Sequence, residues 1–132
     1  MQATGDFDVT VTPQAATAGL ESAALGRMTL AKQFHGDLEA SSLGEMLTAA
    51  GAVQGSAGYV AMERVSGALH GRAGGFVLQH SGTMNRGAPQ LSVTVVPDSG
   101  TGELAGLTGS MTIRNDGGRH SYVFDYALAA PA

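Results

Sequence analysis

The stretch YVAMERVSGALHGRAGGFVLQHSGT, residues 59–83, determines the predicted fold. Apolar and polar residues alternate over Tyr59–Val65 and again over Phe76–Ser81, and a glycine-rich segment without proline joins the two runs. This pattern is typical of a β-hairpin. We place its tight turn at His70-Gly71. The cross-strand pairs that follow from this turn are Ala61 with His80, Glu63 with Leu78, and Val65 with Phe76.

One face of this hairpin is mostly apolar, yet it carries an acid and an imidazole. Glu63 and His80 are diagonal neighbours on that face, close enough for their side chains to meet. We predict that this face points inward and that the more polar opposite face points outward. A register slip of one residue would reverse the assignment, because successive side chains alternate between the two faces.

Length and composition limit the classes of protein that the chain can represent. At 132 residues it is predicted to form a single domain, residues 1–132, because half of it would bury too small a core. The net charge of −4 and the scattered Lys and Arg residues predict no nucleic-acid partner and no binding to anionic membranes. The absence of cysteine excludes disulfides and thiolate chemistry.

The beginning of the chain, MQATGDFDVTVTP, has neither a basic segment nor an apolar core of the kind found in signal peptides. No apolar run reaches the length of a membrane span. We therefore expect a cytoplasmic protein.

Further alternating runs predict the remaining strands. They cover residues 5–12, 27–38, 38–47, 91–96, 104–113 and 120–128. Asn115-Asp116-Gly117-Gly118 is a strong hairpin signal. With Thr12 as N-cap and Pro13 at the first helical position, residues 14–26 are expected to form a short helix, a lid over a barrel mouth, or a plain surface connection. The final AAPA segment is expected to fray.

About eight strands joined by short connections predict an all-β fold, a closed antiparallel β-barrel. Closure removes the exposed sheet edges, and an interior of this size can hold one small ligand. The alternative is a β-sandwich, but no long crossover is evident for its Greek-key topology.

Several motifs resemble a group of small uncharacterised bacterial proteins with an allene-oxide-cyclase-like, calycin-like barrel. They are Lys32-x-Phe34-x-Gly36-Asp37, the pieces ERVSGALHGRAGGFVLQHSG and VVPDSGTGELAGLTG, and the closing YVFDYAL. The resemblance runs from about residue 27 to 128. It implies a barrel like those of allene oxide cyclase, dirigent proteins and small polyketide cyclases, which fold a flexible apolar substrate in a dry cavity. This is an analogy at the level of the fold.

The sequence contains no spacing typical of a metal or cofactor site. The four histidines lie on separate predicted elements, without HxH or HExxH spacing. The glycine-rich segments lack the Lys-Ser/Thr of a phosphate-binding loop, and GxSxG is absent. We therefore predict no metal and no cofactor.

Glu63 and His80 are the candidate catalytic residues. Burial in an apolar cavity is expected to raise the pKa of Glu63, and a neighbouring imidazole can relay its proton. The alternative is a satisfied polar pair that fixes strand register. Lys32 either extends its ammonium out of the barrel end or lies inside against an acid such as Glu63. The residues predicted to contact a ligand are Lys32, Phe34, Tyr59, Phe76, Leu78, Tyr122, Phe124 and Tyr126.

Two functions are consistent with this set of residues. The first is a cofactor-free cyclase or isomerase that folds a flexible apolar, polyketide-like or lipid-like substrate inside the barrel cavity, with a pericyclic cyclisation in natural-product biosynthesis as the example. The second is a non-catalytic binding or carrier protein for a small apolar ligand. A homodimer through the outer face near Met62 and Val77 is also expected, because the core contains few aromatic residues.

Overall fold

The computed structural model describes residues 1–128, and the AAPA segment predicted to fray, residues 129–132, lies outside them. The described part of the chain contains nine strands and one turn of 3-10 helix, η1 (Glu21–Ala23). The strands are β1 (Gln2–Gln14), β2 (Gly26–Gly36), β3 (Leu38–Ala50), β4 (Ala57–Leu69), β5 (Arg72–Asn85), β6 (Ala88–Val95), β7 (Thr101–Gly102), β8 (Thr108–Asp116) and β9 (Arg119–Ala127).

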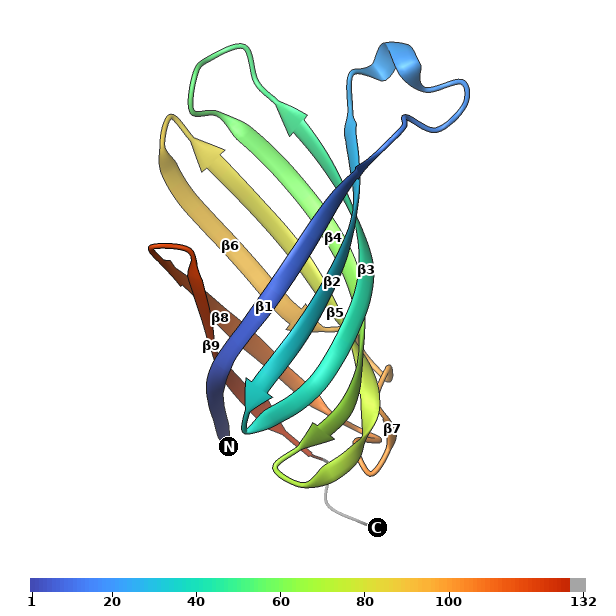
Figure 1. The fold of residues 1–132 in the computed structure, drawn as a ribbon, viewed down its shortest axis with the longest axis vertical. Helices are drawn as coiled ribbons and strands as arrows, with labels where there is room; N and C mark the ends of the chain where they lie inside the picture. The colour runs from blue at the N-terminus through green and yellow to red at the C-terminus, as the bar shows by residue number, and fades with distance from the viewer. Residues whose placement is uncertain (129–132) are drawn as a thin grey trace.

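Eight of these strands form a closed antiparallel barrel (Figure 1). The order around it is β4, β3, β2, β1, β9, β8, β6, β5, and the pairing of β4 with β5 completes the ring. The two-residue strand β7 pairs with β5 at Gly74 and Gly75, before the part of β5 that pairs with β6. The predicted all-β closed barrel is thus confirmed.

The central hairpin has the predicted register. Ala61 pairs with His80, Glu63 with Leu78, and Val65 with Phe76. At the turn, His70 has φ 46° and Gly71 has φ 79°. Positive φ at both central residues is typical of a two-residue hairpin turn, whose twist matches that of the strands. The register places Glu63 and His80 inside the barrel, where both are buried.

One end of the barrel, here called the closed half, is filled by packed side chains. Its inward residues come from strands all around the ring, and the Phe76 and Phe124 rings stack with their centroids 5.7 Å apart. Leu104 and Leu107, from the segment between β7 and β8, are 1% exposed and close the end. The largest buried side chains are Phe34, Leu38, Leu69, Phe76, Leu78, Tyr122 and Phe124.

The other end, here called the open half, is not sealed. β1 pairs with β9 only over residues 2–7, and β6 pairs with β8 only at Thr94 and Ser110. In Figure 1 the β8–β9 hairpin stops well short of the far ends of β1 and β6. Inward positions there stay exposed: Val11 is 44%, Met84 41% and Leu91 43% accessible. The open half therefore presents apolar surface on the inside of the sheet.

One of the alternatives for residues 14–26, a helix that begins at Pro13, was wrong: β1 continues to Gln14, with Pro13 opposite Met28. Proline is tolerated there because β1 has no β9 partner at that position. A helical turn is present further along the segment, as η1. The predicted strand over 104–113 is also wrong in its first half, since β8 begins at Thr108. The leucines before it plug the barrel end instead of alternating along a strand.

No helix in the part of the chain that the structure describes is long and apolar enough to cross a membrane.

Candidate functional site

A buried ionic cluster lies inside the barrel, where the closed half meets the open half. Its centre is Glu63, whose side chain is completely buried. Oε1 of Glu63 lies 2.9 Å from Nζ of Lys32 and 2.6 Å from Nε2 of His80. Oε2 accepts a hydrogen bond of 2.6 Å from the hydroxyl of Ser42. The carboxylate therefore has three side-chain donors, one from each of β2, β3 and β5.

The register of these strands explains why the four side chains meet. Lys32 and Ser42 are directly paired on β2 and β3, and Glu63 lies two residues further along, opposite Gly44. A side chain on Gly44 has no room, because its Cβ would lie 2.3 Å from the carbonyl oxygen of Met62 and 2.9 Å from Cβ of Glu63. The glycine thus leaves space in which the Glu63 carboxylate can reach its partners.

The predicted pKa shift of Glu63 has the wrong sign. Burial does raise the pKa of this carboxyl, as expected. The hydrogen bond from His80, the charge of Lys32 and the hydrogen bond from Ser42 act in the opposite direction and together lower the pKa to about 2. Glu63 is therefore an ionised acceptor at neutral pH and has no proton to donate to a substrate.

Of the two expectations for Lys32, the structure confirms the inside position against Glu63. The ammonium also lies 4.7 Å from the ring centroid of Phe7 and 5.6 Å from that of Phe34. Such cation–π contacts partly replace the hydration that a buried ammonium loses.

An apolar hollow of about 320 Å³ opens above the cluster, on the inner face of β3, β4, β5 and β6. Tyr59 and Gly82, which pair across β4 and β5, lie one row beyond Ala61 and His80. Tyr59 lies over Gly82, where a Cβ would approach the ring to 2.4 Å. The lining residues are Thr48, Ala57, Gly58, Tyr59, Gly82, Thr83, Met84, Pro89, Gln90 and Leu91. We call this the mouth hollow.

Most of the predicted ligand contacts do not line the mouth hollow. Tyr59 lines it, and Lys32 belongs to the ionic cluster one layer below. The other six predicted contacts are at most 5% exposed and fill the closed half: Phe34, Phe76, Leu78, Tyr122, Phe124 and Tyr126. The alternation in sequence identifies inward side chains, but it does not indicate how far along the barrel the packing continues.

Hydrogen bonds explain why two of these aromatic residues belong to the closed half. The hydroxyl of Tyr122 donates to the carbonyl of His35 at 2.9 Å and accepts from the amide of Leu38 at 2.9 Å. The hydroxyl of Tyr126 makes a short hydrogen bond with Nδ1 of His70. Both phenols therefore hold turns at the closed end of the barrel in place through hydrogen bonds.

Sequence reasoning missed Ser42 and the residues of β6 that line the mouth hollow. Ser42 lies in a stretch of small residues that gave only a weak strand signal. Ser42 lies two residues after Ala40, which is 4% exposed, so the two side chains share the inward face of β3. Leu91 was within a predicted strand, but its exposure depends on the missing β6–β8 pairing, for which the sequence has no signal.

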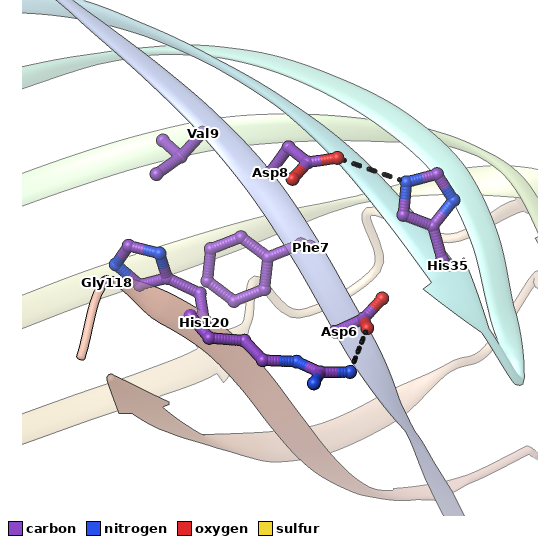
Figure 2. A pocket seen from close by; sticks show the side chains of 8 residues that line it. Asp6, Phe7, Asp8, Val9, His35, Gly118 and His120 are labelled. Atoms are coloured by element: carbon purple, nitrogen blue, oxygen red, sulfur yellow. Dashed lines mark hydrogen bonds and ion pairs between the residues drawn. The ribbon is translucent and has the colours of Figure 1, made fainter. Parts of the chain in front are cut away.

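A second hollow, of about 460 Å³, lies where β1 parts from the β8–β9 hairpin (Figure 2). Figure 2 shows His120 beside Phe7 on one side of β1, with the Asp8–His35 ion pair on the other. Asp6 pairs with Arg119 at 3.3 Å. These charged groups are solvent-exposed and already paired, so they are weaker candidates for ligand recognition than the buried cluster.

Across residues 1–128, no group of three or more His, Asp or Glu side chains has the arrangement of a metal site.

Fold and site together define a small antiparallel barrel with a buried ionic cluster below an apolar hollow. The chain belongs to the DUF3224 family, described as a protein of unknown function, whose family model matches residues 3–126. It is similar to a solved structure of a DUF3224 protein of unknown function from Shewanella oneidensis, with 50% sequence identity and a TM-score of 0.89. The match covers 98% of each chain. No curated protein matches this chain.

Proposed function

We propose that this protein binds a small, largely apolar molecule in the mouth hollow, with the polar end of the ligand toward the ionic cluster. The observation that carries the proposal is the hollow itself: it lies directly beyond His80 and is walled by Tyr59, Met84 and Leu91. Its volume of about 320 Å³ is typical of sites for small ligands, which combine apolar walls with a few polar groups.

A charge in the wall of the hollow tests the proposal. Leu91→Asp should raise the dissociation constant of a neutral apolar dye, such as Nile red, by about tenfold or more, because an apolar ligand would desolvate the carboxylate. The measurement is a fluorescence titration of the folded protein. Leu43→Asp is the matched control, because Leu43 is 73% exposed on the outer face of β3. Equal affinities for wild type and Leu91→Asp would contradict the proposal.

A cofactor-free cyclase or isomerase acting on such a ligand is the second candidate. It is favoured by the position of His80, a titratable side chain held by a carboxylate one inward row below Gly82 of the hollow. The hollow would hold a flexible substrate in one reactive conformation, a contribution that reaches roughly 7–11 kcal/mol in well-oriented systems. Linear polyenes and enones, followed for a change in retention time without a change in mass, are the appropriate substrates.

Self-association through the outer face stays a prediction. Met62 is 51% exposed there, beside Val60 at 53% and Leu47 at 46%, whereas Val77 is half-buried and less exposed than all three. The amide of Val77 donates to the hydroxyl of Ser99, so a loop of the same chain lies against that part of β5. The proposed contact is therefore centred on the exposed apolar residues of the β3–β4 surface and does not include Val77.

We expect a dimer in solution, disrupted by Val60→Lys. A lysine in the middle of a closely packed apolar contact loses hydration without gaining a partner. Light scattering at micromolar concentrations measures the mass. Val53→Lys is the control, since Val53 is also exposed but lies in the β3–β4 loop. A monomeric wild type would show the prediction to be wrong.

A further inference from the structure

The pair formed by Glu63 and His80 fixes which ring nitrogen of the histidine carries hydrogen. Ionised Glu63 can only accept hydrogen bonds, and Nε2 of His80 lies 2.6 Å from its Oε1. Nε2 must therefore be the donor. In a neutral imidazole the other nitrogen, Nδ1, then has a free lone pair and acts as a proton acceptor. A carboxylate that holds an imidazole in one tautomer is the arrangement found in hydrolase triads.

The Nδ1 atom of His80 keeps a small contact with solvent, although the residue is only 4% exposed. Among residues 1–128 this atom has no hydrogen-bond partner, whereas no buried side-chain nitrogen or oxygen there lacks one. Both statements hold together only if Nδ1 reaches solvent. The contact is on the side of the open half, because the His80 side chain points into the barrel and the closed half is filled by packed side chains.

A hydrogen-bond donor lies one inward row nearer the mouth. Tyr59 lines the mouth hollow, and its hydroxyl makes no hydrogen bond to any other residue that the structure describes. Burial, and after it the charge of Glu63, raise the pKa of this phenol. The phenol therefore keeps its proton and can donate it in a hydrogen bond to a carbonyl oxygen.

We propose that the mouth takes an enolisable carbonyl compound, that Nδ1 of His80 is its proton acceptor, and that the Tyr59 hydroxyl binds its oxygen. Glu63 is then a positioning residue, since it acts through His80. This inference rests on the proposed binding function and names the ligand class and chemistry of that same site. The corresponding reaction is the isomerisation of a β,γ-unsaturated ketone to the conjugated α,β-unsaturated ketone.

The proton and electrons balance without a further reactant. Nδ1 removes a proton from the carbon next to the carbonyl, and the electron pair of that C–H bond forms the carbon–carbon double bond of a dienolate. The carbonyl π pair moves onto oxygen, where the Tyr59 hydroxyl stabilises the negative charge. The imidazolium then returns the proton to the γ-carbon, which completes the shift of the double bond and leaves the mass unchanged.

Two charged groups, the Glu63 carboxylate and the Lys32 ammonium, act on the protonated form of His80 in opposite directions. The carboxylate of Glu63 stabilises the imidazolium across 2.6 Å, while the ammonium of Lys32, on the same carboxylate oxygen, opposes it. Tyr59 is neutral at this stage.

The tautomer is measured first, without any ligand. Long-range proton–nitrogen NMR spectra of the histidine rings should show His80 with hydrogen on Nε2 and an unprotonated Nδ1 at neutral pH. Glu63→Gln should change this spectrum, because an amide can donate to Nε2 as well as accept from it. Hydrogen on Nδ1 of His80 in the wild-type protein would overturn the proposal, whatever the protein binds.

Proton transfer is measured next, with medium-chain β,γ-unsaturated ketones in deuterated water. We expect deuterium at the α- and γ-carbons and the absorbance of the conjugated product. His80→Gln should lower the rate by about a hundredfold or more, and Tyr59→Phe by about tenfold or more. Glu63→Gln should lower kcat with little change in ketone affinity. His35→Gln is the control, because His35 is exposed on the outside of β2.

The outcomes separate this inference from the proposed function. Ketones that bind in the mouth, as shown by competition with Nile red, but exchange no hydrogen overturn the proton transfer and leave the binding function intact. Equal rates for wild type and His80→Gln overturn the assignment of the base. Failure of both the dye and the ketones to bind overturns the proposed function, and this inference with it.

Discussion

Lys32→Met is expected to lower the free energy of unfolding by about 3–5 kcal/mol, because it leaves Glu63 charged and buried without its cation. Methionine fills nearly the same volume as the lysine stem, so cavity formation contributes little. The ammonium is 2.9 Å from Oε1 of Glu63, and the side chains of the pair are 6% and 0% exposed. Urea unfolding near neutral pH, followed by circular dichroism, measures the change.

Two variants show whether the effect comes from the buried charge. Adding Glu63→Leu to Lys32→Met should recover part of the lost stability, since no unpaired carboxylate then remains, although His80 and Ser42 lose their acceptor. Arg27→Met removes a comparable cation from the exposed pair with Glu45, whose side chains are 35% and 65% accessible. That change should cost at most about 1 kcal/mol. Equal losses for Lys32→Met and Arg27→Met would contradict the interpretation.

The sequence was sufficient to predict the barrel and the register of its central hairpin. The inward row around Glu63 and His80 is mostly apolar, and a turn at His70-Gly71 places the inward rows of both strands on the same side. A slip of one residue would bury Arg64 and Gln79 in place of Glu63 and Leu78. Because burying these polar side chains would be unfavourable, the register could be predicted from this one hairpin.

The remaining parts of the site depend on contacts between strands that are distant in the sequence. Lys32 and Ser42 reach Glu63 only because β2 and β3 pair with a particular offset, which a pattern within one strand does not specify. For the same reason the sign of the Glu63 pKa shift was predicted wrongly. Burial was visible in the sequence, whereas the number of donors around the carboxylate was not.

The position of the hollow was unpredictable for a different reason. Alternation shows that Tyr59 and Phe76 both point inward, but the first borders an opening and the second lies in a packed core. The difference arises where β1 parts from β9 and β6 parts from β8. Inward side chains in the open half therefore have no side chains opposite them. Strand ends are the least reliable feature of a sequence-based assignment.

Acidification should remove the stabilising effect of the ionised Glu63. Its pKa in the folded protein, about 2, is below the value of 4.5 for an unperturbed carboxyl. The unfolded chain therefore binds the proton first as the pH falls, so the folded state loses stability through the window from about pH 4.5 down to about pH 2. A shift of this size corresponds to a loss on the order of 3 kcal/mol.

Unfolding by urea at a series of pH values measures this dependence. Glu63→Gln lacks the titrating group, so its stability should be lower than that of wild type at neutral pH and should change less with acidification over the same window. Asp37 contributes in the same direction, because the amide hydrogen bond from Thr4 helps to lower its pKa, and Asp37→Asn identifies that contribution. Wild type and Glu63→Gln should differ in slope even when both carry Asp37→Asn. Parallel curves would mean that Glu63 is not the carboxylate whose ionisation holds the barrel together at neutral pH.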